Sequence, residues 1–203
     1  MKVYEAVFKD DMEGVYALSV VENPAMEDMF IALSEDAHKI ELATIDEEKR
    51  LLLGAALIPD KKVYRNVDGH EFFITFKAET IEQLAHSFSK NQNNNNSSLE
   101  HEVALNGMSV VENWIVEDSH KDKSSNYGKN YPVGTCVTMM IVDNDDIRKK
   151  VKNGEIKGFS IDALFGLTEV KINNQNNSVM TKQDFLDAFK VIFSETPKEE
   201  AVE

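Results

Sequence analysis

The chain has 203 residues, and its 36 Asp and Glu against 22 Lys and Arg give a formal net charge of −14. Domains usually contain about 100–200 residues, so one sizeable core is expected. A content of 42% hydrophobic and 29% charged residues is typical of a soluble globular protein and excludes a disordered or membrane chain. So acidic a chain is repelled by phosphate backbones, which argues against a nucleic-acid partner.

The first part of the chain is predicted to be mostly β. Its expected strands cover residues 15–21, 30–33, 40–45, 50–58 and 71–76. Residues 79–90 then change to a helical period, with Ile81, Leu84 and Phe88 on one face. The Asn-rich residues 91–98 predict a mobile surface loop, because their side chains compete for backbone hydrogen bonds and bury nothing, although the end of the loop can be held in place.

Strands are expected to resume at residues 108–117 and 134–142. A short helix is predicted at residues 143–152, where Asp143 or Asn144 can cap the N-terminus and acidic residues precede basic ones. Together with the first part, this pattern predicts an α+β fold.

Residues 155–165 alternate as a strand does. Phe159 and Ile161 are predicted to face the core, while Ser160 and Asp162 face the other way. One face of this strand is therefore available for chemistry.

We expect one domain over residues 1–172, followed at residues 173–203 by a polar linker, an amphipathic helix and an acidic tail. The helix, at residues 181–194, is expected to pack back onto its own domain.

The single cysteine, Cys136, cannot form an internal disulfide, and no Cys/His spacing is that of a structural zinc site. It is expected to be a buried, unreactive residue in a reducing compartment. The longest apolar run, residues 51–58, is far shorter than the ~20 residues of a membrane-spanning helix. The N-terminal residues lack the apolar stretch of a signal peptide, so we expect no export.

A hydroxyl nucleophile needs a base within hydrogen-bond reach, so the relevant pair is one serine and one histidine. Four of the five histidines are expected to be ordinary surface residues: His38, His70, His86 and His120. His101 lies where the Asn-rich segment enters a β region, and Ser160 lies mid-strand two residues after Gly158. Residue types alone do not decide between a catalytic pair and two ordinary polar residues.

The order of several sequence blocks resembles the XkdF-type serine proteases of tailed phages. These blocks include Leu99-Glu100-His101, the strand around Trp114, and Gly158-Phe159-Ser160-Ile161. That group belongs with the prohead (capsid maturation) proteases, which are similar to herpesvirus assemblin. The resemblance covers residues 14–172.

The resemblance implies a mainly antiparallel β-barrel with surrounding helices and a serine endopeptidase activity. Ser160 falls on the family's nucleophile and His101 on its histidine. The third residue would be a carboxylate, because no histidine follows Ser160. Asp162 and Glu112 are the leading candidates, and three other acids remain open: Glu117, Asp118 and Glu169. Assemblin relatives also use an arginine after the nucleophile, but no arginine follows Arg148 here, so the oxyanion donors are unassigned.

The resemblance also implies partners and a location. The substrates would be phage major capsid and scaffold proteins, and the chain itself, inside assembling proheads in the host bacterial cytoplasm. A homodimer is usual among assemblin relatives. No cofactor, metal, nucleic acid or membrane is expected to take part.

Two alternatives stay open. The first is a catalytically inactive capsid-assembly or scaffold-binding module of the same fold. The second is a cation-binding site at residues 143–146, which the helix start already explains and which lacks EF-hand spacing.

Overall fold

The computed structural model describes residues 1–9, 13–26, 31–34, 48–67 and 69–170. The strands are β1 (Lys2–Val7), β2 (Gly14–Val21), β3 (Ile31–Ser34), β4 (Glu48–Leu57), β5 (Val63–Val67), β6 (His70–Phe76), β7 (Ser97–Leu99), β8 (Val103–Leu105), β9 (Met108–Ile115), β10 (Cys136–Val142), β11 (Gly158–Leu164) and β12 (Gly166–Glu169). The helices are α1 (Ala78–Lys90) and α2 (Asp145–Lys152), with 3₁₀ turns η1 (Asn93–Asn95) and η2 (Lys123–Tyr127).

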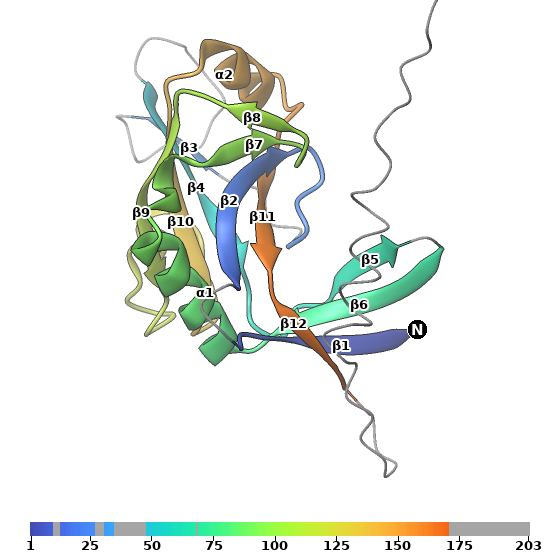
Figure 1. Cartoon of the computed structure of the whole chain (residues 1–203). Coiled ribbons are helices and arrows are strands. Elements are labelled where there is room, and N and C mark those ends of the chain that lie inside the picture. Colours follow the sequence, from blue (N-terminus) through green and yellow to red (C-terminus); the bar gives the residue numbers. More distant parts are fainter. Residues whose placement is uncertain (10–12, 27–30, 35–47, 68, 171–203) are drawn as a thin grey trace, which may run out of the picture.

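The described strands form three four-stranded sheets, in the orders β12-β1-β6-β5, β3-β4-β10-β9 and β11-β2-β7-β8 (Figure 1). Most neighbouring strands are antiparallel, but β1–β6 and β2–β7 are parallel, so two sheets are mixed. The predicted combination of strands and helices is confirmed. The closed barrel is not found among the described strands, because closure requires every strand to have two neighbours and each sheet here ends in edge strands.

The core lies between the sheets and α1. β2 and β11 contribute Val20 and Phe159, both almost fully buried, and α1 contributes Ile81, Leu84 and Phe88 to the same cluster. The predicted alternation of residues 155–165 is therefore confirmed, and the opposite face of β2 and β11 is left for polar side chains.

The Asn-rich segment lies at the surface, as predicted, but its side chains hold more of it in place than the end alone. Asn93 Nδ2 donates to the Val15 carbonyl at 2.9 Å, and Asn94 Nδ2 donates to the Val110 carbonyl at 3.3 Å. Asn96 Nδ2 donates to the Tyr16 carbonyl at 3.0 Å. These amides satisfy backbone acceptors on β2 and β9, and so they fix the entry into β7.

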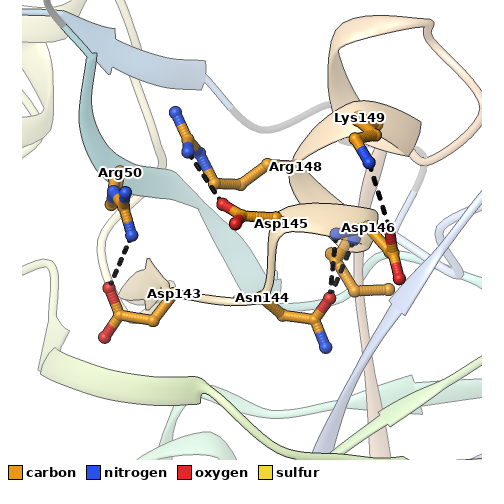
Figure 2. Close-up of polar contacts among 8 residues, drawn as sticks. Arg50, Asp143, Asn144, Asp145, Asp146, Arg148 and Lys149 are labelled. Atoms are coloured by element: carbon orange, nitrogen blue, oxygen red, sulfur yellow. Dashed lines mark hydrogen bonds and ion pairs between the residues drawn. The ribbon is translucent and has the colours of Figure 1, made fainter.

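The acidic run before α2 is a helix start, as predicted. Asn144 Oδ1 accepts hydrogen bonds from the backbone N–H groups of Asp146 and Ile147, which makes Asn144 the N-cap (Figure 2). Asp143 and Asp145 pair with Arg50 and Arg148, at 3.4 and 3.1 Å (Figure 2). These contacts occupy the carboxylates that the cation-binding alternative would need.

Several predictions fall outside the described residues: the strand at residues 40–45, the domain end near Ile172, and the linker, helix and tail of residues 173–203. In the part of the chain that the structure describes, no helix is long and apolar enough to cross a membrane.

Candidate active site

A row of three serines crosses the sheet β11-β2-β7 on the face turned away from the core. The strand register places Ser160 of β11 opposite Ser19 of β2, and Ser19 opposite Ser98 of β7. Asp162 lies two residues along β11 and so shares the face of Ser160. Three segments far apart in the sequence therefore meet in one polar strip.

Asp162 is the centre of the hydrogen-bond network. Its Oδ2 accepts from the Ser98 hydroxyl at 2.9 Å and from the Ser19 hydroxyl at 3.0 Å. Its Oδ1 pairs with His101 Nδ1. The Ser19 oxygen also lies 3.0 Å from His101 Nδ1 and next to the Ser98 oxygen; since each hydroxyl has one proton, a Ser19–Ser98 hydrogen bond would replace one of the two bonds to Asp162.

The network sets the charge of Asp162. Burial alone would raise the pKa of Asp162, but hydrogen bonds from His101, Ser98 and Ser19 and the nearby charge of His101 together lower it below its usual value. An ionised carboxylate only accepts hydrogen bonds, so His101 Nδ1 is the donor. In neutral histidine this leaves Nε2 as the acceptor, which is the arrangement that a general base requires.

His101 is presented by a tight turn between β7 and β8. Glu100 and His101 both have positive φ, at 51° and 64°, and Glu102 N donates to the Leu99 carbonyl at 3.0 Å, as in a type I′ turn. The left-handed conformation costs a non-glycine residue about 1–2 kcal/mol. Such strained residues concentrate at functional sites. The turn leaves the imidazole 41% exposed above a carboxylate that is only 15% exposed.

The structure brings together two of the four predicted site residues directly, His101 and Asp162. Ser160 is 4% exposed and lines the same cavity as they do, but within the described residues no hydrogen bond joins it to His101. The imidazole instead meets Ser19. Glu112 lies on β9, in a different sheet, where its carboxylate pairs with Lys123.

Two of the other acids left open by the sequence also have partners. Asp118 pairs with Lys121 at 3.7 Å, and Glu169 pairs with Lys2 at 3.3 Å. Among the described candidate carboxylates, Asp162 is therefore the one that pairs with His101.

Sequence reasoning missed Ser19 and Ser98. Ser19 alternates with the buried Leu18 and Val20, which already places it on the non-core face of its strand. Ser98 comes three residues before His101. Neither signal alone shows that the two hydroxyls share one carboxylate.

A cavity of about 1350 Å³ opens beside this network. Ser160, His101 and Asp162 line it together with residues of the β5–β6 hairpin, such as Val63 and Phe72. Small-molecule pockets usually measure about 300–1,000 Å³, so this cavity is large enough for a longer ligand such as a peptide segment.

The remaining chemically reactive group, the Cys136 thiol, does not belong to the site. Burial raises the pKa of Cys136 to about 12, and its Sγ donates to Asn113 Oδ1 at 3.0 Å. The prediction that Cys136 is buried is confirmed, and its low reactivity stays a prediction. Among the described residues, no group of three or more His, Cys, Asp and Glu side chains could hold a metal ion.

Comparison with known proteins identifies the family. The family model described as "Putative phage serine protease XkdF" matches residues 39–169, a span that includes His101, Ser160 and Asp162. No curated protein and no solved structure gives a significant match, so the resemblance to assemblin stays a prediction. Because the matched residues make up well over half of the sequence, the chain belongs to this family of phage serine proteases.

Proposed function

We propose that the chain is a serine endopeptidase in which Ser160 is the nucleophile, His101 the general base and Asp162 the carboxylate that orients His101. One observation carries the proposal. His101 is held through Nδ1 by a largely covered, ionised Asp162, and both residues line the same cavity as Ser160. This is the relation between base and carboxylate that serine proteases use.

The register supports a short path between nucleophile and base. Residues directly opposite each other on neighbouring antiparallel strands have Cβ atoms about 5 Å apart, so Ser160 lies beside Ser19. The imidazole contacts Ser19 through Nδ1, so the proposed reaction requires a movement of the ring or of the Ser160 side chain that brings Nε2 to the Ser160 hydroxyl. Contacts between nucleophile and base are often long in unliganded enzymes and tighten when substrate binds.

The proposed reaction follows acyl-transfer chemistry. His101 Nε2 takes the Ser160 hydroxyl proton as Oγ attacks the peptide carbonyl, and it then gives that proton to the leaving amine. Water hydrolyses the resulting acyl-enzyme with His101 again acting as base. Asp162 keeps Nδ1 protonated and stabilises the imidazolium in both steps.

The position of β11 favours an extended substrate. Among the described strands, β11 is an edge of its sheet, so we expect a peptide substrate to pair with it as a further strand, at residues other than Phe159, which already has an interaction partner. We also propose that backbone N–H groups on this edge stabilise the oxyanion. They would take the role that an arginine after the nucleophile has in assemblin relatives, since no arginine follows Arg148 here.

The substrates that we propose are scaffold and capsid proteins of the assembling phage head, and the chain itself, with the reaction confined to the prohead in the host cytoplasm. The family match supports the phage setting. Expression of the parent and Ser160→Ala chains with the capsid and scaffold proteins tests the proposal by intact mass. Truncations that persist with Ser160→Ala would exclude this enzyme as their source. A homodimer stays a prediction, which sedimentation analysis would test.

One observation favours the alternative of an inactive assembly module. Ser160 is 4% exposed, and the hydroxyl that meets His101 belongs to Ser19. A fluorophosphonate probe separates the two functions. The enzyme should be labelled on Ser160, should lose the label in His101→Ala, and should keep it in the surface control Ser125→Ala. An unlabelled parent, or a label that survives His101→Ala, would favour the inactive module.

A further inference from the structure

Arg65 is a charged residue on an apolar wall of the cavity. It lies on β5 between Val63 and Val67, which share its face, and directly opposite Phe72 of β6. All four residues line the cavity, as does Ile74 opposite Val63. The half-buried guanidinium is therefore surrounded by apolar side chains.

The acids of the cavity have partners, and Lys62, a second cation of the lining, has its Nζ 6.0 Å from the centre of the Phe73 ring. Of the described acids that line it, Glu22 lies 3.6 Å from Lys157, and Asp162 pairs with His101. Arg65 has no carboxylate within ion-pair distance among the described residues, and its Nη1 donates to the Tyr64 carbonyl at 2.9 Å. Burial lowers the pKa of Arg65, as expected for a cation without a counter-charge.

The Arg65 guanidinium can therefore form further hydrogen bonds with a ligand in the cavity. A guanidinium has five N–H donors in a planar fork, and one hydrogen bond to a carbonyl leaves most of them for a ligand. A partly desolvated cation without a partner is unfavourable, and an incoming carboxylate can form two parallel charge-assisted hydrogen bonds with it. The position is notable in a chain whose formal net charge is −14, because nearby acids could have neutralised it.

We propose that Arg65 binds the carboxylate of an Asp or Glu side chain of the peptide substrate, within an otherwise apolar groove. Arg65 is then a specificity-determining residue that selects peptides carrying an acidic residue among apolar ones. This inference rests on the proposed function and names its substrate class.

The sheet gives the approximate position of the acidic residue. β5 is separated by three strand spacings from β12, which directly follows β11. Three spacings of about 4.8 Å make about 14 Å, and an extended peptide advances about 3.3 Å per residue. Because Arg65 and Ser160 also line one cavity, we expect the acidic side chain a few residues from the cleaved bond rather than next to it.

The test uses the full chain and a library of peptides from a protease-digested cell lysate. Cleavage sites are sequenced for the parent, Arg65→Met, Arg65→Lys and the surface control Arg50→Gln. Methionine suits the apolar wall, so Arg65→Met should fold, and Arg65→Lys keeps the charge without the fork. Synthetic Glu and Gln versions of the best substrate then give matched kcat/KM values.

The parent and Arg50→Gln should show an acidic residue at one fixed position and should prefer the Glu peptide by about 10- to 100-fold. Arg65→Met should lose this preference by slowing the Glu peptide alone, and Arg65→Lys should keep part of it. Cleavage without acidic preference, or equal losses on both peptides, would overturn the role of Arg65 and leave the protease intact.

A binding arm separates the two proposals. Immobilised Ser160→Ala protein should capture acidic peptides from the same library, and the capture should disappear when Arg65→Met is added. Arg65-dependent capture without any cleavage by the parent would uphold acid recognition and reject the protease. Capture that is indifferent to acidic residues would reject acid recognition whether or not the parent cleaves.

Discussion

Asp162→Asn is the sharpest test of the hydrogen-bond network. The carboxylate receives the Ser19 and Ser98 hydroxyls on one oxygen and His101 on the other. An amide turns one of these acceptors into a donor. If its NH₂ faces His101, Nδ1 must accept and Nε2 carries the proton, so the base can no longer act. If its NH₂ faces the serines, both hydroxyls lose their acceptor, and His101 keeps only a neutral one.

The expected loss is large. Replacing the triad carboxylate by an amide costs about ten-thousand-fold in kcat in a serine protease, or about 5.4 kcal/mol. We expect Asp162→Asn to slow fluorophosphonate labelling of Ser160 by about a thousand- to ten-thousand-fold. The matched control is Asp146→Asn, which removes an exposed carboxylate on α2 and should change nothing. Labelling within a few-fold of the parent, or a greater loss in Glu112→Gln, would refute the assignment of Asp162.

The same substitution should change stability in a pH-dependent way. Because the folded-state pKa of Asp162 is lowered, its contribution is present above the unfolded value of about 4 and is lost as pH falls through the folded value. At pH 7 the loss of these hydrogen bonds should cost about 1–3 kcal/mol, or roughly 2–12 °C in Tm. Thermal melts from pH 7 to pH 2.5 should show the gap between parent and variant closing below pH 4. A gap that widens on acidification would contradict the sign of the pKa shift.

Further tests address the turn, the Asn-rich segment and the thiol. Glu100→Gly should leave Tm within about 2 °C of the parent, because the tolerance of glycine for the φ of 51° offsets the loss of the hydrogen bond that Glu100 Oε1 accepts from the Glu22 N–H at 2.7 Å; Glu102→Gly, at a residue without positive φ, should lower Tm. Asn93→Ala should lower the free energy of unfolding by about 1 kcal/mol in denaturant titrations, and Gln83→Ala on the exposed face of α1 should leave it unchanged or higher. Cys136 should resist iodoacetamide at pH 8 in the folded protein and react only after denaturation; rapid native labelling would contradict its pKa of about 12.

Local sequence patterns predicted the strand that carries the nucleophile candidate. The alternation in residues 155–165 placed Phe159 in the core and put Ser160 and Asp162 together on the opposite face, because side chains alternate along a strand. The same principle applies to Ser19. Its partnership with Ser98, however, depends on the parallel pairing of β2 and β7, two strands about 80 residues apart, and no local pattern encodes that pairing.

The composition of the Asn-rich segment does not show where tertiary contacts hold it in place. Four consecutive asparagines are typical of a mobile loop, yet Asn93 and Asn94 meet carbonyl groups of β2 and β9 that are held in place by other elements. The barrel expectation came from a family resemblance rather than from residues. Seven of the described strands were predicted, whereas β1, β5, β7, β8 and β12 were missed, and whether the outermost strands pair depends on long-range geometry.

The order in which the chain is synthesised has a consequence for the network around Asp162. A ribosome makes Ser19, Ser98 and His101 well before it makes β11. Until β11 has emerged and docked as the neighbour of β2, the imidazole has no carboxylate to fix its tautomer, and Ser160 does not yet exist. Under the proposed function, a nascent chain therefore has no complete catalytic site through most of translation, and the site forms only as the last strands of the domain are added.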